Sequence, residues 1–315
     1  MKTICFASDA EYGQLFSDGC VMALGFFDGV HLAHRHLLSV AKEAARRHGL
    51  PLAVFTFSGD SGIKSSSPRL YQDSDRLSLL AECSVDIAVV ADFGAVSGIT
   101  REDFITDVLI GKFNTRVAVS GYNFAFGKGA LGNVGYLSET LFRHGRECIV
   151  IDEFTAFGER ISTTRIKELI AAHDMEGAAR LLGTPYFIGG EVEHGRGAGK
   201  GLGIPTVNTP LTDTGGMLGY GVYASVIVSD GKRYRALTNV GECPTFGARR
   251  AHAETFILDF DGDLYGKSVR IYLLSYLREE REFSTPDALL QQIKLDTDKA
   301  LSLNLEGLWQ ETGLN

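Results

Sequence analysis

Short apolar runs alternate with amphipathic segments along the first half of the chain. Residues 20–26 and 52–57 are apolar runs of strand length, and residues 34–48 between them carry apolar side chains at helical spacing. Gly49 suits the position after that helix, and Pro51 prevents its continuation. Further strands are predicted at 86–92, 116–120 and 147–151, and further helices at 74–81, 100–110, 137–144 and 163–172. This alternation predicts an α/β domain with a parallel sheet and helices on both faces.

The pattern changes near residue 184, after which short apolar runs alternate with turn residues. Ser229-Asp230-Gly231 is predicted as a tight turn, and residues 259–266 as a hairpin turn. A last helix is expected at 286–303, with Pro286 in its first turn. Strands are predicted at 188–193, 222–228, 233–240, 254–259 and 269–274. We therefore expect a small antiparallel β-barrel with a C-terminal helix.

Length and composition agree with two globular domains, which we place at residues 1–183 and 184–315. The net charge of −8 argues against a dedicated nucleic-acid binder, because such a protein needs a basic surface. No apolar stretch reaches the length of a membrane span or a signal peptide, so we expect no membrane partner and a cytoplasmic location. The five cysteines are scattered without a CxxC pair, which makes a zinc site or a disulfide framework unexpected.

The turn after the first predicted strand carries two histidines. His31 and His34 are three residues apart, so both side chains face the same way on the first helical turn. Ligands of parallel sheets bind beyond the carboxyl ends of strands, and a helix N-terminus favours anions. Two imidazoles there can donate to phosphate oxygens and stabilise charge on a departing pyrophosphate. The alternative is a pair of structural histidines at a helix start.

Three segments of this half resemble the FAD synthetases of the nucleotidyltransferase superfamily. They are GFFDGVHLAH at 25–34, SGYNFAFG at 120–127 and RISTTRI at 160–166. The resemblance implies a Rossmann-like nucleotidyltransferase domain that joins FMN to the AMP part of ATP. It implies catalytic roles for His31, His34 and Arg165. It also implies ATP contacts for Asp28, Gly29, Asn123, Ser162 and Thr163.

The second half contains a glycine-rich segment, with five glycines among residues 195–203. Its backbone could approach phosphates closely, although Lys200 is followed by glycine and the Walker A pattern is absent. The end of this segment, GIPTVN at 203–208, resembles the G-x-P-T-A-N motif of riboflavin kinases. Residues 239–247 and 253–266 resemble two further segments of that family.

The riboflavin kinase resemblance assigns roles to five residues. Thr206 and Asn208 would hold Mg²⁺ and the ATP phosphates, and Lys200 and Gly203 would contact ATP. Glu254 would accept the proton of the ribityl 5′-hydroxyl. Without the motif, Glu254 would be interpreted as a solvated edge residue. Together the resemblances cover residues 25–303 and imply a bifunctional enzyme whose substrates and products are riboflavin, FMN, FAD and ATP.

Two alternatives stay open. The family's T-F-x-P-H-P segment is replaced here by TFSGDSGIKSSSP, and Ala33 and Ala125 replace a glycine and an arginine. These departures motivate a riboflavin kinase whose adenylyltransferase domain is degraded or repurposed. The second alternative is a flavin- or nucleotide-binding regulator without catalysis. The retention of Glu254, Thr206 and Asn208 counts against it.

Overall fold

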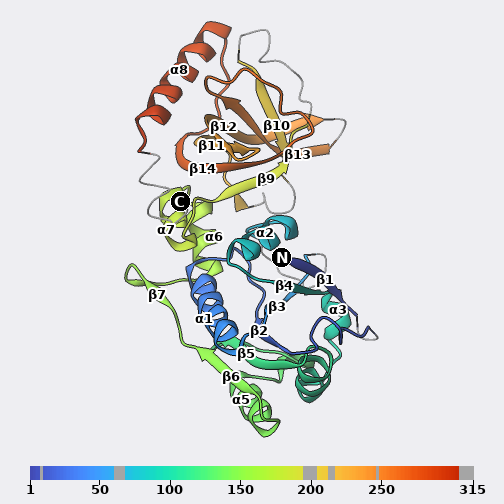
Figure 1. Ribbon diagram of the computed structural model, residues 1–315. Coiled ribbons are helices and arrows are strands. Elements are labelled where there is room, and N and C mark those ends of the chain that lie inside the picture. Colours follow the sequence, from blue (N-terminus) through green and yellow to red (C-terminus); the bar gives the residue numbers. More distant parts are fainter. Residues whose placement is uncertain (8–9, 60–67, 194–203, 212–216, 246–247, 305–315) are drawn as a thin grey trace. The chain divides into compact units, whose positions relative to one another are not determined.

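The computed structural model describes residues 1–7, 10–59, 68–193, 204–211, 217–245 and 248–304 (Figure 1). Their contacts divide the chain into two compact units. The first unit comprises Met1–Ser66 and Asp73–Ile161, and the second comprises Ser67–Gln72 and Ser162–Asn315. Two helices that precede residue 183 therefore have most of their contacts within the second unit. The domain boundary at residue 183 stays a prediction.

The first unit is built on a parallel sheet, as the sequence predicts. Its strand order is β1-β4-β3-β2-β5-β6, and every neighbouring pair in this order is parallel. The strands are β1 (Lys2–Phe6), β2 (Cys20–Leu24), β3 (Leu52–Phe57), β4 (Ile87–Ala91), β5 (Thr115–Gly121) and β6 (Glu147–Ile151). The predicted strands correspond to β2 through β6, and β1 was not predicted.

Helices cover both faces of this sheet. On β2, Cys20, Met22 and Leu24 join one apolar core together with residues of α5 (Val134–Arg143) and of the π-helical segment η1 (Phe104–Lys112). The opposite face is covered by α1 (Leu32–His48), whose contacts are with β2, β3 and β5. The remaining elements of the unit are α2 (Asp73–Glu82), α3 (Phe93–Val96), α4 (Arg101–Asp103), η2 (Lys128–Ala130), β7 (Thr155–Ala156) and β8 (Glu159–Arg160).

The strand order reverses direction between β2 and β5. From β2 the chain continues to β3 and then β4 on one side, whereas β5 and β6 add on the other side. Such a reversal opens a crevice beyond the carboxyl ends of the two central strands, which is where open α/β sheets bind ligands. The segments that follow β2 and β5 are the two glycine-containing motifs with His31 and Asn123. The fold thus places both motifs at the same end of neighbouring strands.

The second unit contains an antiparallel sheet with strand order β10-β13-β12-β11-β14-β9. An isolated antiparallel bridge between Glu193 and Asn208 joins the segment after β9 to β10, so the two ends of the sheet meet. This closure confirms the predicted barrel. The strands are β9 (Phe187–Glu191), β10 (Thr206–Pro210), β11 (Gly221–Ser229), β12 (Lys232–Thr245), β13 (Ala248–Ile257) and β14 (Ser268–Arg278), and the helices are α6 (Thr163–Ala171), α7 (Met175–Leu182) and α8 (Pro286–Ser302).

One turn of the barrel is confirmed and another is wrong. Ser229 pairs with Lys232, and Asp230 and Gly231 between them have φ values of 49° and 73°, as a type I′ hairpin requires. The hairpin predicted at 259–266 is wrong because β13 and β14, which this segment connects, are not neighbours in the sheet. The segment instead crosses from one side of the β12–β11 pair to the other. In the described part of the chain, no helix has the length and apolar character that crossing a membrane requires.

Candidate active sites

The turn between β2 and α1 has an unusual backbone. Phe27 and Val30 have positive φ values of 56° and 42°, and Gly29 has φ 86°. Positive φ is costly for a bulky or β-branched side chain, and such strain is concentrated at functional sites. Both side chains are buried, at 1% and 0% exposure, so core packing holds the turn in place. Asp28 in the same turn is also buried.

The two predicted histidines are in direct contact. His31 caps α1, and its Nδ1 accepts a hydrogen bond from the His34 backbone N–H at 3.4 Å. The two rings stack with centroids 3.7 Å apart. Because Nδ1 of His31 is the acceptor in this geometry, the proton of the neutral ring lies on Nε2, from which it can be donated to an anion. The structure therefore places two imidazoles in contact at the N-terminus of α1, with Nε2 of His31 as a donor.

Burial keeps both imidazoles neutral. It lowers the pKa of His31 to about 4, and it lowers the pKa of His34 well below its usual value, with a further contribution from the neighbouring His31. Nδ1 of His34 is buried without a hydrogen-bond partner among the described residues. A polyanion arriving at this helix end would supply hydrogen-bond acceptors for these neutral imidazoles.

Asn123 lies in the loop after β5, at the same edge of the sheet, and is exposed. The preceding Tyr122 donates its hydroxyl to Glu153 at 2.6 Å, and the same carboxylate oxygen receives Arg160 Nε at 3.0 Å. These contacts connect the loop after β5 to the hairpin that contains Arg160. Sequence analysis missed Glu153, because it lies outside every motif.

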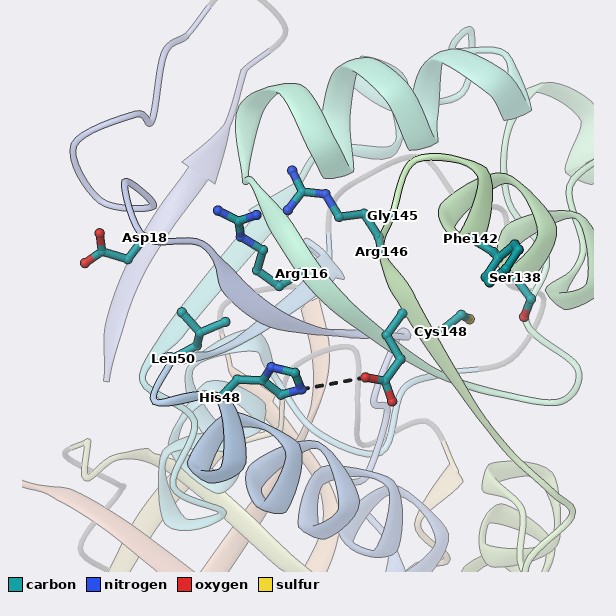
Figure 2. A pocket seen from close by; sticks show the side chains of 10 residues that line it. Asp18, His48, Leu50, Arg116, Ser138, Phe142, Gly145, Arg146 and Cys148 are labelled. Atoms are coloured by element: carbon teal, nitrogen blue, oxygen red, sulfur yellow. Dashed lines mark ion pairs between the residues drawn. The ribbon is translucent and has the colours of Figure 1, made fainter.

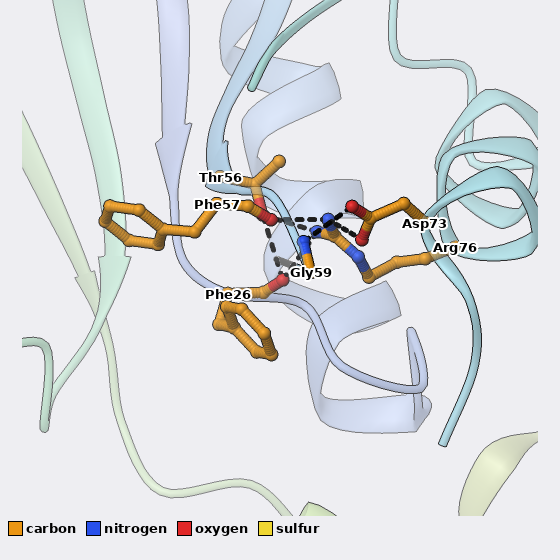
Figure 3. A network of polar contacts seen from close by, with 6 residues as sticks. All are labelled: Phe26, Thr56, Phe57, Gly59, Asp73 and Arg76. Carbon is orange, nitrogen blue, oxygen red and sulfur yellow. Dashed lines mark hydrogen bonds and ion pairs between the residues drawn. The ribbon is translucent and has the colours of Figure 1, made fainter. Parts of the chain in front are cut away.

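A buried arginine fixes the carboxyl ends of β2 and β3 (Figure 3). Arg76 of α2 is fully buried and donates to Phe26 O at 2.9 Å, to Thr56 Oγ1 at 2.6 Å and to Phe57 O at 2.6 Å. Asp73, one helical turn earlier, receives Arg76 Nη2 at 2.9 Å. Phe26 opens the turn that carries His31, so this network positions the first site. Arg76 was also missed, although the Asp73–Arg76 spacing on one helix face is visible in the sequence.

The boundary between the two units runs through the RISTTRI segment: residues 160–161 belong to the first unit and residues 162–166 to the second. Ser162 caps α6, where its Oγ accepts the Arg165 N–H at 3.2 Å, which confirms a capped helix at this motif. The Arg165 side chain lies 3.5 Å from Glu168 Oε2, and both side chains are substantially exposed. Ser162, Thr163 and Arg165 belong to the second unit, whereas His31 and His34 belong to the first. A shared site for these residues stays a prediction.

The barrel aligns three polar side chains across neighbouring strands. Glu254 of β13 is directly opposite Asn208 of β10 and directly opposite Asn239 of β12. Residues in register across a sheet lie on the same face. Thr206, two residues before Asn208, donates its hydroxyl to Glu254 Oε1 at 2.6 Å. The structure thus brings together Thr206, Asn208 and Glu254 and adds Asn239, which sequence analysis did not select.

Thr206, Asn239 and Glu254 line a cavity of about 390 Å³ in the second unit. Asn239 Nδ2 donates to Glu280 Oε1 at 2.8 Å, and its Oδ1 is buried with no partner among the described residues. On the far wall, Arg278 Nε donates to Asp296 Oδ2 of α8 at 2.9 Å. The apolar lining residues are Ile204, Val222, Leu237, Phe256, Phe283, Leu289 and Ile293. An apolar cavity with a few convergent polar groups is typical of a small-molecule site.

Two predicted ATP contacts, Lys200 and Gly203, lie outside the described residues, together with most of the glycine-rich segment. The described groups around Glu254 include oxygen atoms of the kind that a hard cation binds: the Thr206 hydroxyl, the Asn208 side-chain oxygen and the Glu254 carboxylate. Mg²⁺ prefers oxygen ligands of this kind and is usually bound together with substrate phosphates.

Comparison with known proteins matches each half of the chain to a family. The riboflavin kinase family model matches residues 182–304, and the FAD synthetase model matches residues 14–165. A bifunctional riboflavin kinase/FMN adenylyltransferase from Escherichia coli K12 is 32% identical over 90% of this chain and 92% of its own length. The proteins of the same description from Bacillus subtilis and Listeria monocytogenes are each 32% identical, over 89% and 94% of this chain.

A solved structure resembles nearly the whole chain. It is a protein from Streptococcus pneumoniae described as a macrolide-efflux protein, with a TM-score of 0.84 and 28% identity, covering 96% of this chain and all of that one. The similarity supports the observed fold. With both family models matched and relatives above 30% identity aligned over nine-tenths of its length, the chain belongs to the bifunctional riboflavin kinase/FMN adenylyltransferase family.

Proposed function

We propose that the barrel phosphorylates riboflavin to FMN. The observation that carries this proposal is Glu254, held by Thr206 and aligned with Asn208 and Asn239 at an apolar cavity. Glu254 takes the proton of the ribityl 5′-hydroxyl while that oxygen forms a bond to the γ-phosphorus of ATP. The bond between the γ-phosphorus and the bridging oxygen breaks, and ADP leaves.

Thr206 and Asn208 are the residues that we propose hold Mg²⁺ with the ATP phosphates, with Lys200 and Gly203 contacting the nucleotide. Bound there, the ion would neutralise phosphate charge. The hydrogen bond from Thr206 also fixes the direction of the Glu254 carboxylate. Because a misplaced base loses much of its effect, we expect this positioning to matter as much as the basicity of Glu254.

We further propose that the predicted domain of residues 1–183 adenylylates FMN. A phosphate oxygen of FMN attacks the α-phosphorus of ATP, the bond to the β-phosphate oxygen breaks, and pyrophosphate leaves. The FMN phosphate is ionised near neutral pH, so no strong base is needed. Nε2–H groups of His31 and His34 donate to the phosphates, and Arg165 adds positive charge. Asp28, Gly29, Asn123, Ser162 and Thr163 complete the proposed ATP site.

A histidine double variant tests the second reaction. His31→Ala with His34→Ala should abolish FAD formation from FMN and ATP while FMN formation from riboflavin continues. His36→Ala is the matched control, because His36 is exposed on the same helix and should leave both activities unchanged. Equal loss of both activities in the double variant would contradict separate sites. We propose that both reactions take place in the cytoplasm, where free thiols such as Cys5 and Cys83 stay reduced.

A further inference from the structure

Another cavity lies in the first unit, at the amino-terminal edge of its parallel sheet (Figure 2). This edge is opposite to the one that carries His31 and Asn123. It has a volume of about 870 Å³. Its walls come from the end of α1, the starts of β5 and β6, and the segment that follows α5. The proposed catalysis uses none of these residues.

Two arginines line this cavity near one another. Figure 2 shows the guanidinium groups of Arg116 and Arg146 on the same side of the cavity, and the charge of Arg116 acts on Arg146. Arg146 Nη2 donates to Asn114 Oδ1 at 3.2 Å, whereas its Nη1 is buried with no hydrogen-bond partner among the described residues. Neither guanidinium has an ion pair within the described part of the chain.

This arrangement is unfavourable without a ligand. Burial, and then the neighbouring Arg116, lower the pKa of Arg146, so its charged form is less stable here than in water. A buried donor without an acceptor carries a further cost. Helix C-termini favour cations, and α1 and α5 end near this edge. That effect explains why basic residues lie here, but it supplies no acceptor for Arg146 Nη1.

The acidic residues of the cavity do not neutralise the pair. The carboxylate of Asp18 points away from Arg116 in Figure 2. Glu147 Oε2 lies 3.6 Å from His48 Nε2 and is thus directed to the histidine. An incoming anion would therefore find two adjacent guanidinium groups, with the Ser138 side chain as a further lining group.

We propose that this cavity binds a phosphate group between Arg116 and Arg146. The planar guanidinium fork matches phosphate oxygens, and a phosphate oxygen would provide the acceptor that Arg146 Nη1 lacks. A doubly charged anion would also remove the repulsion between the two arginines. The phosphate is either the free ion or part of a mononucleotide, because both present the same oxygens. The site is distinct from both proposed catalytic sites and does not depend on their assignment.

Calorimetric titration of the full chain with inorganic phosphate, in phosphate-free and nucleotide-free buffer, tests the proposal. We expect saturable millimolar or tighter binding by the wild type. Arg116→Ala and Arg146→Lys should each weaken it about tenfold or more, because each loses charge-assisted hydrogen bonds. Arg143→Ala, which removes the same charge from an exposed position on α5 outside the cavity, should bind phosphate as the wild type does.

The source of the phosphate is settled by repeating the titration with AMP in a His31→Ala, His34→Ala background. Tighter binding of AMP than of phosphate, lost with Arg116→Ala, supports a nucleotide ligand, whereas equal or weaker binding supports the free ion. Unchanged phosphate affinity in both arginine variants overturns the proposal, as does absence of saturable binding by the wild type. Because Arg116 is exposed, its variant should fold, which the melting temperature checks.

Discussion

At the scale of single residues, the buried histidines couple the stability of the first unit to pH. His31 has a folded-state pKa of about 4, below the value of about 6.5 for an unfolded chain. Below pH 6.5 the unfolded chain takes up a proton that the folded chain does not, so stability is lost as pH falls. The same burial that keeps the imidazoles neutral donors therefore makes the fold sensitive to acid.

His31→Asn should remove part of this sensitivity. Asparagine is a good N-cap, so α1 should keep its start. Between pH 7 and pH 5, the wild type should lose about 2 kcal/mol more of unfolding free energy than the variant. Urea unfolding followed by circular dichroism at the two pH values measures this difference. Equal losses in the two proteins would show that His31 already binds its proton at pH 5 in the folded state.

Replacing Arg76 should destabilise the fold strongly. Replacement by methionine removes the hydrogen bonds from Arg76 to Asp73 and to the Phe57 carbonyl, and breaking a buried pair costs about 3 kcal/mol. Because Phe26 opens the turn with His31, FAD formation from FMN should fall more than FMN formation. Denaturant unfolding and the two assays test this, with Arg46→Met at an exposed i,i+3 pair as control. A variant as stable as the control would contradict the role of the network.

At the scale of elements, α8 forms one wall of the barrel cavity. Asp296, at 1% exposure, accepts Arg278 Nε and Gln292 Nε2, and Leu289 and Ile293 of the same helix line the cavity. Asp296→Asn should lower stability by about 2 kcal/mol, because the largely buried Arg278 loses its counter-charge. The KM for riboflavin should rise as the wall loosens. Asp298→Asn, exposed on the same helix, is the control, and an unchanged KM in Asp296→Asn would contradict this role of α8.

The sequence predicted best those elements that bury a whole strand or one face of a helix, because burial gives their apolar residues a clear pattern. The strand β2 is buried along its length, and α1 buries one face, so their apolar patterns are clear. The strand β1 was missed because most of its residues are exposed and its pattern is weak. The strand β10 was also missed, because it contains Thr206, Asn208 and Pro210 and lacks an apolar run. Pro210 is tolerated because β10 pairs along its length with β13 only, and the bridge on its other side is at Asn208.

The candidate sites were predictable only as far as local sequence defines them. Motifs indicated His31, His34, Thr206, Asn208 and Glu254, and the structure shows the contacts within each group. The position of Asn239 opposite Glu254 depends on the register of β12 against β13, which no local pattern specifies. Arg76 contacts a backbone carbonyl at a strand end, and Glu153 contacts a side chain that is distant in the sequence. Such contacts can be identified only when the strand ends are placed in space.

At the scale of the whole molecule, the two activities should be separable. Glu254→Gln keeps the size of the side chain but removes its ability to accept a proton. This variant should lose FMN formation from riboflavin and keep FAD formation from FMN. Chromatography of the flavin products after each incubation measures both activities. Loss of FAD formation from FMN in this variant would contradict the division of labour between the two units.

The most direct test of the account is chromatography of flavins made by the wild-type protein. One incubation contains riboflavin, ATP and Mg²⁺, and a second contains FMN, ATP and Mg²⁺. The account predicts FAD in both, because the chain carries the proposed catalytic groups of both reactions. FMN accumulating from riboflavin, with no FAD in either incubation, would contradict it and leave a riboflavin kinase with a repurposed first unit.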